Sequence, residues 1–357
     1  MNSKKFGLFI GVTIVVLLLA IYANQKQQAD LQSNVAGQAL YPQLSKQLND
    51  VNEVVVESSA GLVNIHRNGE RWLVKQRNDY PADMGKLKQV ILGLADMKLI
   101  EAKTQRSESY SKLGIEEPME ENSKNLRVIL KSGENELASI IIGNERSGSG
   151  GASQSRYVRK SGDAQSWLVK TDIAIDKEAQ HWLDDTLANI KAERTRSIQY
   201  KQADGKSMTI TKNQFDAKDY SVLALPKDKE INSQSTVNNL ATALQSLTLQ
   251  DVVPATAAKT DSKPNSTEIQ TYDGLVIRIN SYLQDGQTLN IFEANFDANA
   301  RIAETDENKD KLKSADDVKK EAEALQAQWQ PWAYVLSSTN INKLNKKLAD
   351  ISRDIKK

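Results

Sequence analysis

The feature that most constrains this chain is an apolar stretch near its N-terminus, FGLFIGVTIVVLLLAIYA, over residues Phe6–Ala23. The stretch contains no charged residue, and as a helix it would be about 27 Å long, close to the hydrocarbon thickness of a bilayer. Lys4 and Lys5 precede it, and segments rich in lysine tend to stay in the cytoplasm. The sequence therefore predicts one membrane-spanning helix that keeps the N-terminus cytoplasmic and exports the rest of the chain.

The residues expected to anchor the chain in the lipid bilayer are the large apolar side chains of this helix, namely Phe6, Leu8, Phe9, Ile10, Val15, Leu18, Ile21 and Tyr22. A cleaved signal peptide is the alternative, because Ile21-Tyr22-Ala23 is a weak cleavage site. The length of the apolar run and the bulk of Tyr22 favour an anchor that is not cleaved.

The composition argues against several classes of protein and site. The 357 residues include 47 Lys and Arg against 46 Asp and Glu, whereas nucleic-acid-binding proteins carry a basic patch or stripe. The absence of cysteine excludes disulfides and thiolate chemistry, and His66 and His181 alone do not make a zinc site with three histidines. We therefore expect no nucleic-acid partner, no cofactor, no metal site and no catalytic residue.

The chain beyond residues 1–23 divides into a stalk and two folded domains. Residues 24–44 are polar and rich in glutamine, which predicts a stalk. The changes in hydrophobic period place the first domain at residues 45–194 and the second at residues 195–357. Within the second domain, residues 306–328 form a charged helical insertion that we expect to face solvent.

The two domains share one pattern of expected elements. Each begins with three short strands and a helix with apolar residues in 3-4-3 spacing, which are Met84, Leu87, Ile91 and Leu94 in the first and Val237, Leu240, Leu244 and Leu247 in the second. Hairpins with turns at Ser132-Gly133 and Asp273-Gly274 follow, and each domain ends in an expected helix, over residues 177–194 and 342–355. The sequence therefore predicts an α+β protein built from two duplicated antiparallel sheet-plus-helix domains.

The candidate partner-binding residues fall in two groups, Arg156, Tyr157 and Arg159 in one, and Trp329 and Trp332 in the other. The first group lies in a strand after the glycine-rich loop Ser147–Ser155, where a partner could add a strand by edge pairing. The loop lacks the Gly-Lys-Ser/Thr ending of a phosphate-binding loop. The two tryptophans are the best surface candidates among the aromatic residues, although packing in the core is the favoured interpretation of both.

Several short motifs occur in a fixed order between Asn52 and Arg196: Trp72-Leu-Val, Tyr80-Pro-Ala-Asp83, Tyr110, Leu113-Gly-Ile-Glu-Glu-Pro118, Ile142-Gly-Asn144, Arg156-Tyr-Val158 and Trp167-Leu-Val169. In this order the chain resembles the bacterial family called domain of unknown function 4340. The resemblance implies an N-terminal membrane helix and a place beside ABC transporters of the kind associated with gliding motility, next to a larger auxiliary subunit. It implies no catalytic residues.

Three functional hypotheses follow. The first is a non-enzymatic, single-pass accessory subunit of an ABC-type transport system in the bacterial inner membrane, whose periplasmic body binds a permease, an auxiliary membrane subunit or cargo. The second is a stand-alone module of the cell envelope that binds glycan or lipid, for which a tryptophan-lined groove would be the sign. The third is a hydrolase, which would require His66 or His181 beside a serine and a carboxylate.

Overall fold

The structure is a computed structural model that describes residues 35–118, 123–146, 155–212, 214–305 and 308–355. The predicted anchor Phe6–Ala23 and most of the glycine-rich loop, residues 147–154, lie outside these residues. Over the ranges that are described, no helix combines the length and the apolar character needed to cross a bilayer.

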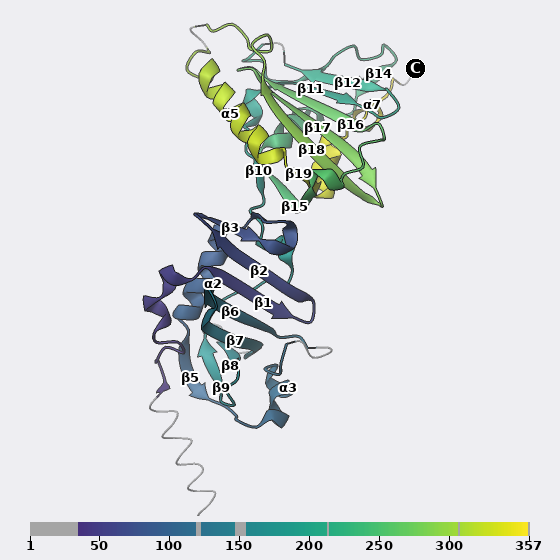
Figure 1. Cartoon of the computed structure of the whole chain (residues 1–357). Helices are drawn as coiled ribbons and strands as arrows, with labels where there is room; N and C mark the ends of the chain where they lie inside the picture. The colour runs from purple at the N-terminus through teal and green to yellow at the C-terminus, as the bar shows by residue number, and fades with distance from the viewer. Residues whose placement is uncertain (1–34, 119–122, 147–154, 213, 306–307, 356–357) are drawn as a thin grey trace, which may run out of the picture. The chain divides into compact units, whose positions relative to one another are not determined.

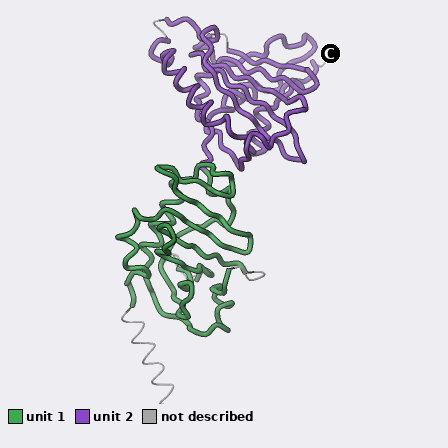
Figure 2. Tube along the Cα trace, in the orientation of Figure 1, with its two compact units in different colours: residues 1–183 green, residues 184–357 purple. Residues whose placement is uncertain are grey.

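The described chain forms two compact units that divide between Leu183 and Asp184 (Figures 1 and 2). Each unit contains a nine-stranded sheet in which all recorded strand pairs are antiparallel, with few helices. The predicted α+β class with antiparallel sheets is therefore confirmed. The unit boundary lies about ten residues before the expected one at residues 194–195.

Unit 1, which ends at Leu183, has the strand order β4-β3-β2-β1-β6-β7-β8-β9-β5. Its strands are β1 (Glu53–Ser58), β2 (Gly61–Asn68), β3 (Arg71–Val74), β4 (Tyr80–Pro81), β5 (Lys98–Ala102), β6 (Leu126–Ser132), β7 (Asn135–Arg146), β8 (Ser155–Lys160) and β9 (Ser166–Lys170). Its described helices are α2 (Met84–Ala95) and α3 (Tyr110–Leu113). The side chain of Asp83 accepts hydrogen bonds from the amides of Gly85 and Lys86, so the predicted N-cap of α2 is confirmed.

Unit 2 has the strand order β10-β15-β19-β18-β17-β16-β11-β12-β13, and a separate ribbon of β14 and β20. Its strands are β10 (Thr186–Ala188), β11 (Thr195–Lys201), β12 (Ser207–Thr211), β13 (Ser221–Val222), β14 (Lys229–Ile231), β15 (Leu247–Pro254), β16 (Asn265–Thr271), β17 (Leu275–Gln284), β18 (Gln287–Phe296), β19 (Trp332–Leu336) and β20 (Ser352–Asp354). Its helices are α4 (Gln234–Leu240), α5 (Ala315–Trp329), α6 (Ser338–Leu344) and α7 (Leu348–Ile351).

The two large sheets have the same order of equivalent strands. Reading the second sheet from β13, its strands β13-β12-β11-β16-β17-β18-β19-β15 correspond in chain order to β3-β2-β1-β6-β7-β8-β9-β5 of the first. Along the chain, α2 lies between β3 and β5, and α4 lies between the equivalent strands β13 and β15. This shared order is the arrangement that the predicted internal repeat requires.

In each unit a segment that precedes β1 or β11 also pairs with the sheet, and we call it the entry segment. The sequence analysis predicted neither of the two. In unit 2 it is β10, which pairs with β15 at the edge of the sheet. In unit 1 the amide of Gly37 donates to the carbonyl of Leu99 at 2.8 Å, and Ala39 forms a bridge with Lys98 of β5. Part of the predicted stalk therefore belongs to the sheet of unit 1, because backbone hydrogen bonds hold it along β5.

Two expected long helices do not form as such, because their residues pair with other parts of the chain. Over residues 177–194 the structure has a 3-10 turn at Ala179–Trp182, then β10. There Leu183 forms a bridge with Ala82, and the amide of Asp83 donates to the carbonyl of Trp182. Over residues 342–355, α6 and α7 are short because Ser352–Asp354 pairs with β14 as β20. Tertiary hydrogen bonding thus overrides local helix propensity.

The 3-4-3 stripes were also only partly correct. In α2 the buried apolar residues are Leu87, Val90 and Leu94, whereas Met84 is exposed. In unit 2 the helix α4 ends at Leu240, and Leu247 starts β15 by pairing with Ala188. The edge strand of unit 2 therefore ends the helical segment earlier than the apolar period predicts.

Cross-strand register divides the sheet of unit 2 into an apolar and a polar face. Directly opposed residues share a face, and one such row runs through Tyr200, Thr267, Ile279 and Phe292. Helix α6 covers this row, since Tyr200 and Thr267 donate their hydroxyl hydrogens to carbonyls of Lys343 and Leu344. The neighbouring row is polar and runs through Gln199, Glu268, Arg278 and Glu293.

The charged insertion forms helix α5, but one of its sides is buried. Val318, Ala322 and Trp329 are buried, and the ring of Trp329 lies 5.3 Å from that of Phe292 on the apolar face. Figure 1 shows α5 running alongside β17 and β18. The expectation of a solvent-facing helix was wrong for this side, because every third or fourth residue of the charged segment is apolar.

The motif Leu113-Gly-Ile-Glu-Glu-Pro118 packs on the sheet of unit 1, where Ile115 is fully buried. Gly114 ends α3 in the left-handed conformation, with φ of 66°, which glycine adopts without strain. A Cβ atom on Gly143 of β7 would lie 2.5 Å from the carbonyl oxygen of Leu113 and 2.6 Å from that of Gly114. The close approach of loop and strand therefore requires glycine at residue 143.

We predict that Gly143→Ala destabilises the protein by about 1–3 kcal/mol, because backbone atoms must move to admit the new methyl group. The measurement is urea unfolding of the full chain in detergent. The matched control is Ser139→Ala in the same strand. This substitution also introduces an alanine, but it adds no atom at the contact between the strand and the loop. Equal stability of the two variants would contradict this account of the motif.

Candidate functional site

The strand that carries Arg156, Tyr157 and Arg159 is an interior strand. β8 pairs with β7 on one side and with β9 on the other over these residues. A partner strand cannot add there, because both rows of backbone hydrogen-bonding groups are already used. The expected edge pairing at this strand was therefore wrong.

Arg159 serves the structure of unit 1. Its side chain is buried, and its guanidinium donates to the carbonyls of Ile115 and Asp163 and, at 2.7 Å, to the carboxylate of Glu117. The same group lies over the ring of Tyr110, 4.6 Å from its centroid. Arg159 thus holds the segment Leu113–Pro118, which we call the motif loop, against the sheet. A partner could reach Arg159 only by displacing that loop.

Arg156 and Tyr157 are both partly buried. Arg156 forms an ion pair with Glu145, and the ammonium group of Lys103 lies 5.8 Å from the ring centroid of Tyr157. These two side chains remain candidates for a surface contact, without the edge pairing that was expected.

Three of the five tryptophans are buried, and the other two, Trp167 and Trp332, are partly exposed. Trp329 is fully buried and its indole nitrogen donates to the carbonyl of Leu187 at 3.2 Å, so its surface role was wrong. Trp72 and Trp182 are buried as well, whereas Trp332 is partly exposed at the start of β19. An indole that is enclosed by protein cannot stack on a sugar.

Both histidines lie at the surface beside carboxylates. His66 is 3.7 Å from Asp79, and His181 is 3.3 Å from Asp176 and 3.9 Å from Glu178. Across the described ranges, no group of three His, Cys, Asp or Glu side chains is placed to hold a metal ion.

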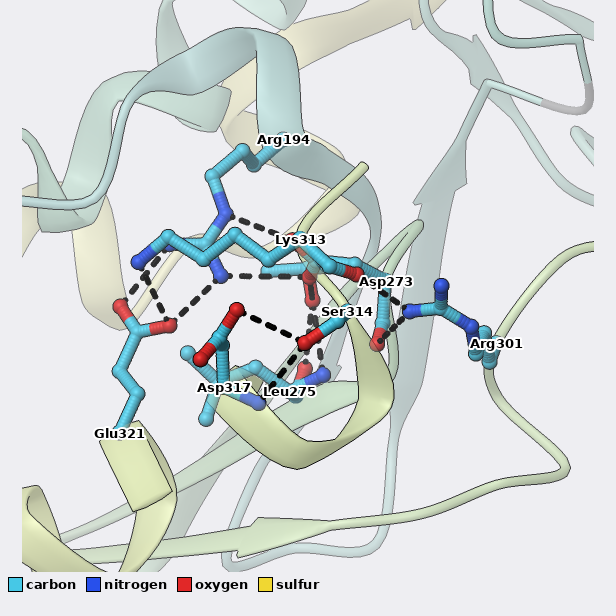
Figure 3. Close-up of polar contacts among 9 residues, drawn as sticks. Arg194, Asp273, Leu275, Arg301, Lys313, Ser314, Asp317 and Glu321 are labelled. Atoms are coloured by element: carbon cyan, nitrogen blue, oxygen red, sulfur yellow. Dashed lines mark hydrogen bonds and ion pairs between the residues drawn. The ribbon is translucent and has the colours of Figure 1, made fainter. Parts of the chain in front are cut away.

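The most extensive buried polar cluster centres on Arg194, at the end of a 3-10 turn just before β11 (Figure 3). Its guanidinium donates to both carboxylate oxygens of Asp273, at 3.0 and 3.2 Å, and to both of Glu321, at 2.9 and 2.8 Å. Asp273 is 1% exposed and lies in the turn between β16 and β17, whereas Glu321 lies on α5. One cation therefore joins the entry to β11, the β16–β17 turn and the helical insertion.

The start of α5 is fixed by a second set of contacts (Figure 3). Arg301 donates to the backbone carbonyls of Asp273 and Lys313, at 3.1 and 2.7 Å. Ser314 caps the helix by accepting a hydrogen bond from the amide of Asp317. Lys313 in turn lies 3.0 Å from Glu321.

Burial and pairing act in opposite directions on this cluster. Burial alone raises the pKa of Glu321, but the hydrogen bonds and charges of Arg194 and Lys313 outweigh it and leave the pKa below its ordinary value. Burial lowers the pKa of Arg194, and its hydrogen bonds to Glu321 and Asp273 outweigh that effect and raise it. Both shifts favour the charged forms of Arg194 and Glu321 at neutral pH.

A cavity of about 700 Å³ opens beside the cluster, and its lining includes Lys191, Arg194, Lys212, Phe215, Lys311 and Lys313; we call it the basic cavity. Phe215 packs edge-on against Tyr272, with ring centroids 4.9 Å apart. Burial raises the pKa of Tyr272 to about 12, so this phenol is neutral at physiological pH. The carboxylates of Glu193 and Asp216 also line the basic cavity.

Nothing in the spacing of the sequence pointed to this site. Arg194 and Asp273 are 79 residues apart, and Arg194 and Glu321 are 127 apart. The only local sign was the Asp-Gly pair at residues 273–274, which was correctly interpreted as a hairpin turn.

The sequence was compared with protein families, curated proteins and solved structures. The profile of a family described as a domain of unknown function, DUF4340, matches residues 72–267, more than half of the 357-residue chain. No curated protein and no solved structure matched. The matched range includes the motif loop, Gly143 and Arg159 of unit 1 and Arg194 of unit 2.

We predict that Arg194→Ala lowers the free energy of unfolding by about 3–5 kcal/mol, because Asp273 would remain as a buried, unpaired carboxylate. Urea unfolding of the full chain measures the change. The matched control is Arg278→Ala on the polar face. Its side chain is 50% exposed and pairs with Glu268 and Glu293, so the expected loss is below about 1 kcal/mol. Comparable losses in both variants would refute the central role of Arg194.

We further predict that the stability contributed by Glu321 depends on pH. Its folded-state pKa lies below the unfolded value of about 4.3, so the contribution is present above that value and is lost as pH falls through the folded pKa. Glu321→Gln should cost about 1–3 kcal/mol at pH 7 and less at an acidic pH where the folded-state carboxylate is protonated. Thermal unfolding at both pH values tests this, with Glu323→Gln on the same helix as the control. A difference that does not vary with pH would contradict the prediction.

Proposed function

Because the chain belongs to the DUF4340 family, we propose that it is a non-catalytic, single-pass accessory subunit of an ABC-type transport system in the bacterial inner membrane. In this proposal its N-terminus is cytoplasmic and its two units lie in the periplasm. The anchor contacts the lipid bilayer and packs beside a permease or an auxiliary membrane subunit. The two units, which we infer to be duplicated copies, bind partner subunits or cargo.

The observation that carries the proposal is the junction between the apolar segment and the first sheet. Gly37 and Leu40 donate backbone hydrogen bonds to Leu99 and Met97 at the edge of unit 1. Roughly 14 residues separate Ala23 from Gly37, and an extended chain of that length spans at most about 50 Å. A helix in the membrane would therefore hold unit 1 close to the bilayer surface, within reach of the periplasmic side of a transporter.

The polar clusters of both units support a role in binding rather than in catalysis. The charges of Arg159 and Arg194 are matched by carboxylates or backbone carbonyls that hold neighbouring segments together. These contacts stabilise the packing within each unit, and the guanidinium groups of both arginines are occupied by them. The alternative of a glycan-binding module loses three of its five tryptophans, because Trp72, Trp182 and Trp329 are buried.

We predict that the full chain, extracted in mild detergent at native expression, co-purifies with an ABC permease and its ATPase. Mass spectrometry should recover these subunits in fixed ratio, because helices packed together in the membrane remain associated in mild detergent. An unrelated single-pass protein, expressed and extracted in the same way, is the control. A solitary, monodisperse protein would contradict the proposal.

The orientation can be checked independently with alkaline phosphatase fused after Lys357. This reporter needs disulfides and is therefore active only outside the cytoplasm. An inactive fusion would refute the periplasmic location of the two units. A mature chain that starts at Asn24 would refute the uncleaved anchor, and with it the proposed membrane subunit.

A further inference from the structure

We propose that the basic cavity of unit 2 binds a glycerol phosphate group, either as a free ester or as the headgroup of a lipid. The inference concerns the surface of unit 2 alone and does not depend on the transport role. It rests on the charges, the aromatic rings and the size of the basic cavity.

The cations that line the basic cavity are of two kinds. Arg194 and Lys313 are neutralised by Asp273 and Glu321, and Arg194 uses four of its N–H groups in those pairs. These two side chains mainly shape the wall.

Lys212 and Lys311 are held in a different way. Their ammonium groups lie 5.3 Å from the ring centroid of Tyr220 and 5.5 Å from that of Phe215. An aromatic ring positions an ammonium group without cancelling its charge. Over the described residues neither Lys212 nor Lys311 forms an ion pair with a carboxylate. The same holds for Lys191, which also lines the basic cavity.

The charge and shape of the lysines suit a phosphate better than a flat carboxylate. The ammonium group of lysine is a compact point charge with three donors, and several of them can surround a tetrahedral anion. Two or three such groups match a phosphate ester, whose charge at neutral pH is about −1.5 to −2 as a monoester. The phosphodiester of a lipid headgroup carries a single negative charge and retains the tetrahedral shape. A planar carboxylate would be better matched by the fork of an arginine, and the fork of Arg194 is already occupied.

The remaining lining indicates the organic part of the ligand. Glu193 and Asp216 lie in the wall as hydrogen-bond acceptors, which suits the hydroxyl groups of a polyol. Phe215 offers an apolar surface for the carbon atoms of the polyol. The volume of about 700 Å³ lies in the range of small-molecule sites and exceeds what a lone phosphate needs. A phosphorylated glycerol satisfies all three features.

The test is lysine acetylation of the full chain in phosphatidylcholine vesicles, followed by mass spectrometry. One arm adds glycerol 3-phosphate to the solution, and the other replaces part of the lipid with phosphatidylglycerol. The internal controls are Lys201 and Lys263, which line a separate cavity on the polar face of unit 2. Glycerol without phosphate is the ligand control.

At a ligand concentration about ten times Kd, Lys191, Lys212 and Lys311 should react about tenfold more slowly, whereas Lys201 and Lys263 should be unchanged. Protection in the first arm identifies a free ester as a ligand, and protection in the second identifies a lipid headgroup. The proposal is overturned if neither arm protects the cavity lysines, if all five lysines are protected alike, or if glycerol alone protects as well.

A pair of charge-matched variants completes the test. In Lys212→Gln/Lys311→Gln the protection of Lys191 should disappear, because the two cations that hold the phosphate are gone. In Lys201→Gln/Lys263→Gln it should persist. Both variants lose two surface charges, so retained protection in the first variant would also overturn the proposal. Circular dichroism checks that each variant is folded.

Discussion

Unit 2 depends on one buried cation, the guanidinium of Arg194. It satisfies the carboxylate of Asp273, which burial would otherwise make very unfavourable, and it holds Glu321 of α5 at the same time. The carbonyl of Arg194 also accepts the amide hydrogen of Tyr272. The entry to β11, the end of β16 and the helical insertion are therefore fixed together, and the wall of the basic cavity is fixed with them.

The two units use the same sheet with different additions. In unit 1 the motif loop packs against β7 and β8 through Gly143 and Arg159. In unit 2 the insertion α5 covers part of the apolar face and places Lys311 and Lys313 beside the loop that follows β12. The basic cavity thus lies beside the segment that unit 2 inserts between β18 and β19.

Much of the fold was predictable because local patterns and tertiary contacts agree there. Alternating apolar residues gave most of the paired strands, and the turns at Ser132-Gly133 and Asp273-Gly274 gave their hairpins. The failures were the terminal helices and the entry segments. In each of these the chain pairs with a strand remote in sequence, and no local period records such pairing. The division between the units, between Leu183 and Asp184, also differs from the expected one because β10 pairs with β15 of unit 2.

The sequence by itself determined the apolar N-terminal segment, the antiparallel α+β class and the cap of α2, because hydrophobic period and capping act over a few neighbouring residues. Only the tertiary structure decided that Trp329 is core, that β8 is an interior strand and that Arg194 meets Asp273 and Glu321. These outcomes depend on which distant segments become adjacent. The burial of a charge or an indole is a property of that packing, so no short stretch of sequence contains it.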